Sequence, residues 1–227
     1  MTSPSLRRRL AGSGLVAAAL FKLASVLLWP KQGSAGVELN SAAAHPAAWT
    51  AASFTWLCFI ACIGAGTLGL AHLVRQGRGA SLVQGASAVV LLSMLAWGGA
   101  GALALQEVVL ARQPDRPAMV ALYADMKHSS ALFAYVLLLM LGEVALVALF
   151  AGLRRARLVP LWQPFAMIAA ITLDVAGDST LYGVFESMLL LAAFGTAGIR
   201  LLRMTDAAWE HPTPLDPERP RTALQTA

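Results

Sequence analysis

The sequence predicts an all-α integral membrane protein, a polytopic transmembrane bundle of six helices with both termini in the cytoplasm. First, the 227 residues are 58% hydrophobic and only 13% charged, with a mean hydropathy of +0.66, whereas soluble domains have about 25% charged residues. Second, six apolar stretches are long enough to cross a bilayer, which takes ~20 helical residues. Third, basic residues gather at alternate ends of these stretches. Such a composition excludes a disordered chain, a disulfide-stapled mini-protein and an ordinary cytosolic enzyme.

Each apolar run is expected to be a helix, because inside lipid every backbone polar group must be hydrogen-bonded within the segment. The first run has 20 residues, against ~7–15 in the apolar region of a signal peptide, so we expect it to be retained as an anchor. The third run exceeds what a bilayer needs, and we place its membrane part at residues 86–105. The fifth run is short. The predicted spans are residues 10–29, 48–74, 81–110, 129–153, 158–173 and 179–202.

Orientation follows from the rule that cytoplasmic loops are richer in Lys and Arg. Four basic residues flank the poorer set of span ends, and Lys22 lies within the first span. The richer set has twelve, namely Arg7, Arg8, Arg9, Arg75, Arg78, Arg154, Arg155, Arg157, Arg200, Arg203, Arg219 and Arg221. Both termini are therefore predicted to be cytoplasmic, and the protein to reside in a bacterial cytoplasmic (inner) membrane.

Three parts are expected along the chain: a cytoplasmic N-terminus (1–9), the transmembrane domain (10–203) and a disordered cytoplasmic tail (204–227) rich in proline. Within the domain, Asp115 followed by Pro117 in the loop 112–128 indicates a helix start. Apolar residues then recur at helical spacing, which predicts a short amphipathic helix on the outer surface. Its buried face, covering the mouth of the bundle, would consist of Met119, Leu122, Tyr123 and Met126.

The ionisable residues inside the spans are the most informative polar positions. They are Lys22, Glu143 and Glu186, and a charge at the bilayer centre costs ~2.5–3.5 kcal/mol on insertion scales. Lys22 lies ~4 Å and Glu186 ~7 Å outward of the middle of their spans, whereas Glu143 lies ~3 Å inward, so Lys22 is matched to Glu186. One interpretation is a proton or ion path with a salt-bridged gate. The other is a structural ion pair that sets helix register, with Glu143 protonated and hydrogen-bonded to a neighbour.

A second polar group is predicted at the outer boundary. Its members are Glu107, Asp125, His128 and Asp174. Carboxylates with a histidine can bind a divalent cation, and solvated loop residues are the alternative. Asp174 sits in the last turn of its helix, where a negative charge opposes the helix dipole, so it should have a cationic partner such as Lys127 or Arg112.

Small residues four apart form faces on several spans, for example Ala61 with Ala65 and Gly98 with Ala102. Such faces allow close helix packing. The packing can be within the bundle, between the two copies of a homodimer, or against another membrane protein. Cys58 and Cys62 are expected to be buried apolar residues. The histidines do not form a haem ligand set, and no motif of a known enzyme class is present, so we expect no catalytic residue, no metal and no cofactor.

A basic turn followed by proline and tryptophan ends the fourth span. It reads Arg-Arg-Ala-Arg-Leu-Val-Pro-Leu-Trp over residues 154–162, after His128 and after Gly142 within the span. In these features the segment 126–170 resembles a broad group of uncharacterised bacterial six-helix membrane proteins. The resemblance implies the six-helix fold and the membrane location, and it implies no activity or catalytic residue. Glu143 departs from the group, whose fourth span is apolar and glycine-rich.

Three functions are open to a protein of this kind. The first hypothesis is a non-enzymatic regulatory or accessory membrane protein that acts through its outer loop and cytoplasmic tail. The second is a small-molecule or ion-coupled transporter that uses Lys22, Glu143 and Glu186. The third is a membrane-bound anti-sigma-type regulator. The expected partners are the lipid bilayer and a protein bound by the tail, and not nucleic acid, because the basic residues are split into short clusters between apolar runs.

Overall fold

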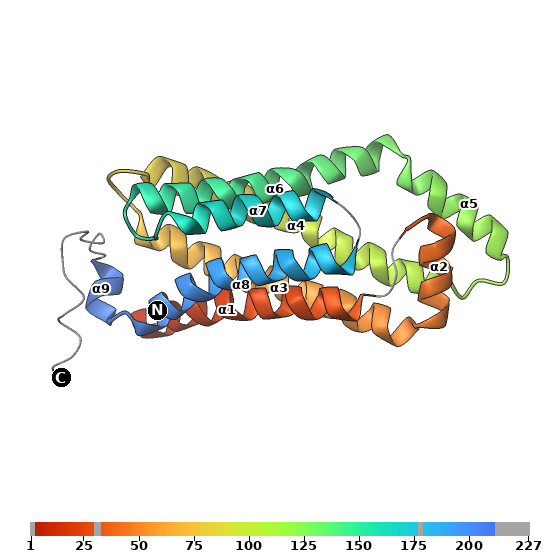
Figure 1. The fold of residues 1–227 in the computed structure, drawn as a ribbon, viewed down its shortest axis with the longest axis horizontal. Helices are drawn as coiled ribbons and strands as arrows, with labels where there is room; N and C mark the ends of the chain where they lie inside the picture. The colour runs from red at the N-terminus through yellow and green to blue at the C-terminus, as the bar shows by residue number, and fades with distance from the viewer. Residues whose placement is uncertain (1–2, 30–32, 177–178, 212–227) are drawn as a thin grey trace.

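The computed structural model describes residues 3–29, 33–176 and 179–211, and within these ranges the chain forms helices and no strand (Figure 1). The all-α prediction is confirmed. The helices are α1 (Pro4–Leu28), α2 (Ala35–Ala44), α3 (Pro46–Leu73), α4 (Ala80–Leu110), α5 (Arg116–Lys127), α6 (Ser130–Arg155), α7 (Trp162–Ala176), α8 (Thr180–Arg203) and α9 (Asp206–Glu210).

Side chains that cap free backbone N–H groups mark several of the helix starts. Ser3 accepts from Leu6 N–H before α1, and Asp115 accepts from Ala118 N–H before α5, as its position ahead of a proline predicted. The same arrangement opens three further helices, with the caps Ser129 before α6, Ser179 before α8 and Thr205 before α9.

Five of the described helices are long and apolar enough to cross a membrane, namely α1, α3, α4, α6 and α8. The span predicted at 158–173 is displaced along the chain, because the helix there, α7, covers Trp162–Ala176. Arg157 has a left-handed backbone with φ of 58°, and Leu158 N–H donates to the Leu153 carbonyl, so a turn takes up the first residues of that span. With 15 residues, α7 is about 22 Å long, which is less than the ~30 Å hydrocarbon core of a bilayer.

The long helices form one elongated bundle in which α1 packs against α3 and α8, and α4 packs against α3 and α6 (Figure 1). The short helix α7 lies against α8 and α6. The helices α1 and α8 approach each other closely at two glycines: a Cβ on Gly12 would lie 2.9 Å from the Gly198 carbonyl oxygen. Small residues therefore serve packing within the chain here, although Ala61 and Ala102 of the predicted small-residue faces remain exposed.

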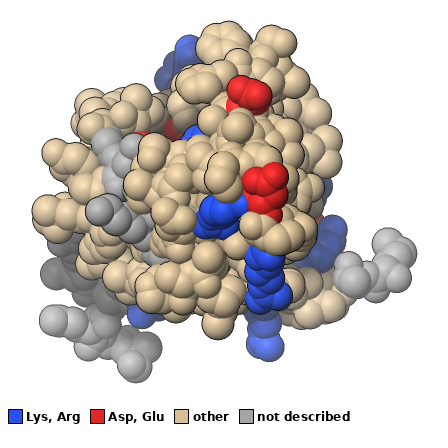
Figure 2. Space-filling view, turned by 90° about the vertical axis from the view of Figure 1, so that its right-hand side faces the viewer, with Lys and Arg blue, Asp and Glu red and all other residues tan. Residues whose placement is uncertain are grey.

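The end of the bundle formed by α2 and α5 holds a separate apolar cluster. It contains Leu39 of α2 and Trp49 of α3, with Met119 and Tyr123 of α5 packed against it. The short helix predicted here is thus present, but Leu122 is 45% exposed rather than part of its packed face. Figure 2 looks onto this end, where a few charged side chains lie among uncharged ones.

The opposite end carries the N-terminus and α9 (Figure 1). Trp209 of α9 is 2% exposed and stacks on His72 of α3, with ring centroids 4.5 Å apart. Arg8 Nε donates to the Asp206 carboxylate at 3.1 Å. The tail predicted to be disordered from residue 204 therefore begins as a docked helix, and its remainder, 212–227, lies outside the described residues.

Candidate functional site

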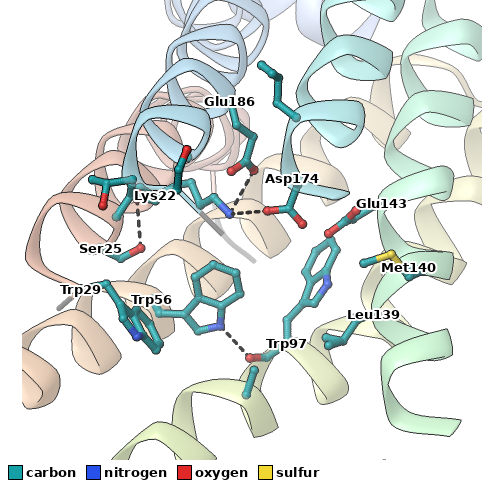
Figure 3. A pocket seen from close by; sticks show the side chains of 16 residues that line it. Lys22, Ser25, Trp29, Trp56, Trp97, Leu139, Met140, Glu143, Asp174 and Glu186 are labelled. Atoms are coloured by element: carbon teal, nitrogen blue, oxygen red, sulfur yellow. Dashed lines mark hydrogen bonds and ion pairs between the residues drawn. The ribbon is translucent and has the colours of Figure 1, made fainter. Parts of the chain in front are cut away.

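A chamber of about 680 Å³ lies between the helices of the bundle, lined by residues of α1, α3, α4, α6, α7 and α8 (Figure 3). The three ionisable residues predicted inside the spans all line it. Its ionisable side chains are Lys22, Glu143, Asp174 and Glu186, and its tryptophans are Trp29, Trp56 and Trp97.

Lys22 projects from α1 and is 7% exposed. Its Nζ lies 3.0 Å from Oε1 of Glu186 on α8 and 3.7 Å from Oδ1 of Asp174 on α7 (Figure 3). The contact between Lys22 and Glu186 is the one predicted from the depths of these two residues in their spans. The same ammonium group lies 4.8 Å from the centroid of the Trp56 ring, within the range of a cation–π interaction.

Close packing of α1 on α8 is what brings these two charges together. Gly183 lies one turn before Glu186, and Val26 lies one turn after Lys22. A Cβ on Gly183 would lie 2.9 Å from Cγ1 of Val26, so a larger residue there would push the helices apart. A glycine beside the ion pair therefore keeps both side chains within hydrogen-bond distance.

Asp174 belongs to the chamber and not to the outer group in which the sequence placed it. It lies in the last turn of α7 and pairs with Lys22, whereas the predicted partner Lys127 pairs with Glu38 at 2.8 Å. The expectation that this carboxylate needs a cation was sound, since it opposes the dipole at a helix C-terminus. Its partner was misassigned because sequence position alone does not tell which helix α7 faces.

Glu143 lines the chamber from α6, and its Oε2 is buried without a hydrogen-bond partner among the described residues. In Figure 3 its carboxyl group points toward Asp174. Glu143 is therefore near the ion pair, but Lys22 makes its ion-pair contacts with the other two carboxylates. Burying a polar atom without a hydrogen-bond partner costs roughly 1–3 kcal/mol. Binding of a proton or a cation at Glu143 would reduce this cost.

The charges of the chamber do not balance. Among its described lining residues, three carboxyl groups accompany one ammonium group, so full ionisation would leave these residues with an excess of two negative charges. Uncompensated charge is unfavourable at membrane depth. The chamber can therefore take up protons or a positively charged ligand, and it has no free cation among its described lining residues to offer an anion.

Aromatic rings form a second part of the lining, and no site was predicted there from the sequence. Trp56 donates its indole N–H to the Trp97 carbonyl at 2.8 Å. The ring of Phe59 packs against both tryptophans, with its centroid 5.3 Å from that of Trp56 and 6.3 Å from that of Trp97. Tryptophan is normally enriched at membrane interfaces. The positions of Trp56 and Trp97, well inside α3 and α4, could therefore have indicated an aromatic site within the membrane.

The other residues of the predicted outer group are not gathered into one site. Glu107 is buried and accepts a hydrogen bond from the Tyr123 hydroxyl at 2.5 Å, and that hydroxyl also lies 2.9 Å from Glu38 Oε2. Asp125 and His128 are exposed at the surface of α5 and its end. Burial, together with the hydrogen bond to Glu107, raises the pKa of the Tyr123 phenol.

Among the described residues, no three His, Cys, Asp or Glu side chains are placed to hold a metal ion together. Cys62 is partly buried, and Cys58, expected to be buried, is exposed on the surface of α3. No protein-family model, no curated protein and no solved structure matches the chain. The resemblance carried by residues 126–170 therefore stays a prediction.

Proposed function

We propose that this protein is an ion-coupled transporter of the bacterial cytoplasmic membrane, whose chamber around Lys22 takes up protons and a small solute. The observation that carries the proposal is the excess of carboxyl groups among the described residues of the chamber: Glu143, Asp174 and Glu186 line it with one ammonium group, that of Lys22. Ionisable residues at membrane depth mark ion and proton pathways in many membrane proteins. A volume of about 680 Å³ suits a small-molecule site, for which ~300–1,000 Å³ is usual.

The proposal includes six membrane crossings with both termini in the cytoplasm. The Lys and Arg distribution supports this orientation, and it turns the α2 and α5 end outward. The sixth crossing is assigned to α7, since a short apolar helix can cross where the bilayer thins locally or where neighbouring helices shield its ends. The chamber then lies in the outer half of the membrane.

In this proposal proton binding and solute binding use the same charges. The ion pairs of Lys22 with Glu186 and Asp174 hold α1, α8 and α7 together in the conformation of this structure. Protonation of either carboxylate weakens its attraction to the ammonium group and loosens that contact. Glu143, which makes no ion pair among the described residues, is the group to which we assign the exchanged proton.

Reconstituted vesicles test the transport function. Full-length protein in liposomes that enclose a pH-sensitive dye should dissipate an imposed pH gradient faster than protein-free vesicles when a solute of the right class is added. Glu143→Gln should abolish the difference. Asp125→Asn, which removes an exposed carboxylate on α5, should leave it unchanged. Equal rates with and without protein across a panel of cationic, anionic and neutral solutes would contradict the proposal.

The regulatory and anti-sigma hypotheses depend on the cytoplasmic tail, most of which lies outside the described residues. They stay predictions, and a pull-down separates them from transport. Full-length protein should capture a cytoplasmic partner and protein truncated after residue 211 should not, if either regulatory hypothesis holds. A transporter requires no such partner.

A further inference from the structure

We infer that the solute is a hydrophobic organic cation, which places its charge at Glu143 and its apolar part against Trp56 and Trp97. Ammonium groups carrying aromatic or branched apolar substituents have this chemistry. The inference names the substrate class of the proposed transporter and rests on that function for turnover. Binding of the cation can be measured independently of transport.

The sign of the ligand's charge follows from which side chains of the chamber already form ion pairs. Lys22 is within 3.0 Å of Glu186 and 3.7 Å of Asp174, so its ammonium group is satisfied by two carboxylates. Glu143 keeps one buried oxygen without a hydrogen-bond partner in the described part of the chain. A cationic ligand beside the Glu143 carboxyl group makes a new ion pair, whereas an anion would have to displace a carboxylate from Lys22.

The aromatic wall favours an organic cation over a small inorganic one. Trp56 already has an ammonium group, that of Lys22, 4.8 Å from its ring centroid, so a ring of this wall contacts a cation within the same chamber. Its indole N–H is engaged with the Trp97 carbonyl, which fixes the ring in place. Figure 3 shows both rings projecting toward the ionisable side chains. Aromatic rings are a usual means of recognising quaternary ammonium groups.

The size and the remaining lining agree with an apolar substituent. The chamber of about 680 Å³ is far larger than a proton or a bare metal ion needs, and Leu139 and Met140 of α6 line it beside Glu143. Methionine adapts its shape to different apolar groups. The chamber therefore suits a family of hydrophobic cations rather than one rigid molecule.

Proton exchange follows from the same geometry. The charged groups that face Glu143 are Asp174 from α7, Glu186 from α8 and Lys22 from α1, while α3 and α4 contribute the uncharged Trp56 and Trp97. Among the described residues, two like charges and one opposite charge therefore lie around this carboxyl group. A bound cation favours the ionised form, so cation binding should release a proton from the site.

Calorimetric titration of full-length protein in detergent with benzyltrimethylammonium tests binding. This probe carries a permanent charge and no acidic proton, so any proton released comes from the protein or the buffer. We expect it to bind at least about tenfold more tightly than N,N-dimethylbenzamide or benzenesulfonate, which share its ring but are neutral and anionic. Affinity should fall as the pH is lowered, approaching about tenfold per pH unit where one proton competes with one cation.

Matched variants place the probe in the chamber. Glu143→Gln should weaken binding at least about tenfold, the size expected from a lost charged contact, and remove the pH dependence, while Glu143→Asp restores part of both. Trp56→Leu should weaken binding more than Trp56→Phe, which keeps a ring. Asp125→Asn is the control, and the melting temperature of each variant shows whether it folds.

The outcomes separate the site, the substrate class and transport. Equal affinity for the cation, the amide and the sulfonate, or binding that Glu143→Gln leaves unchanged, overturns this inference. Proton flux driven by other solutes, without binding of the cation, overturns the inference and leaves transport intact. Binding of the cation that requires Glu143, without proton flux in liposomes, supports the substrate class and overturns transport.

Discussion

Lys22 is held by two carboxylates, and this determines what single substitutions should do. Lys22→Met leaves Glu186 and Asp174 without their shared cation, so we expect the larger loss of stability, up to about 3–5 kcal/mol. Glu186→Gln should lose less, because Asp174 stays within 3.7 Å of the ammonium group. Thermal unfolding in detergent, with the yield of folded protein from the membrane, measures both effects.

The double substitution Lys22→Met with Glu186→Gln removes one positive and one negative charge together. It should recover much of the stability that Lys22→Met loses, since of the two carboxylates that pair with Lys22 only Asp174 is then left without a cation. A double variant less stable than either single variant would contradict pairing in the folded membrane protein. The measurement is the same thermal unfolding, compared as a double-mutant cycle.

Tyr123 connects the carboxyl groups of two helices at the α2 and α5 end. Its hydroxyl lies 2.5 Å from Glu107 Oε1 and 2.9 Å from Glu38 Oε2, but it has one proton and can donate to only one of them at a time. Lys127 holds the other carboxyl group, with Nζ 2.8 Å from Glu38 Oε2. Burial and the hydrogen bond to Glu107 raise the pKa of Tyr123 above its ordinary value.

Tyr123→Phe removes the donor and leaves Glu107 buried without it, so we expect a loss of about 1–3 kcal/mol in the free energy of unfolding. The loss should shrink at alkaline pH. Because the folded-state pKa lies above the unfolded value of about 10, the phenol contributes stability below pH 10 that declines as the pH rises further. Chemical unfolding at neutral pH and above pH 10 checks both statements. Tyr182→Phe, at a residue that is 40% exposed, is the control and should change little.

Among the helices, α9 shows how five residues can hold a chain end in place. Trp209 fills a site against α3 and stacks on His72, and Arg8 of α1 binds Asp206 as well as the carbonyls of Leu201 and Leu202. A buried tryptophan of this kind is worth about 3–5 kcal/mol. That free energy exceeds what a five-residue helix has on its own, so docking, and not helix propensity, keeps α9 folded.

Trp209→Ala should therefore release α9 locally while the bundle stays folded. Trypsin should then cleave after the exposed Arg203 about tenfold faster or more, with the product identified by mass spectrometry. Glu210→Gln breaks only the partly exposed pair of Glu210 with Arg7, which is worth about 0–1 kcal/mol, and should leave the cleavage rate near that of the unmodified protein. Similar rates for both variants would show that Trp209 does not anchor the tail.

For the protein in its membrane the direct prediction is topological. Reporter fusions after Arg78, Arg157 and Arg203 should report the cytoplasm, and fusions near Gly36 and Ala118 should report the outside. The physical reason is the retention of Lys and Arg on the cytoplasmic side during insertion. A fusion after Arg157 that reports the outside would overturn the six-crossing arrangement, and with it the assignment of α7 as a crossing.

Sequence position alone was enough to locate the long helices and to predict which two of the intramembrane charges meet. Lipid leaves helix as the fold for isolated apolar runs, and a helix rises 1.5 Å per residue, so sequence position converts directly into depth. For this reason the positions of Lys22 and Glu186 within their spans were sufficient to match them. Sequence position also places the ionisable Glu143 at membrane depth, but it does not determine which residues lie beside it.

Which faces of the helices meet is a property of the tertiary structure. Depth says nothing about rotation around a helix axis or the choice of neighbour, and these depend on side-chain packing, as at Gly183 against Val26. That packing brings Asp174 to Lys22, places Trp56 and Trp97 in the same chamber, and makes a helix of residues 35–44, where the apolar pattern predicted no element. It also orders the start of the tail, because Trp209 gains its stability from contact with α3 and not from its own short helix.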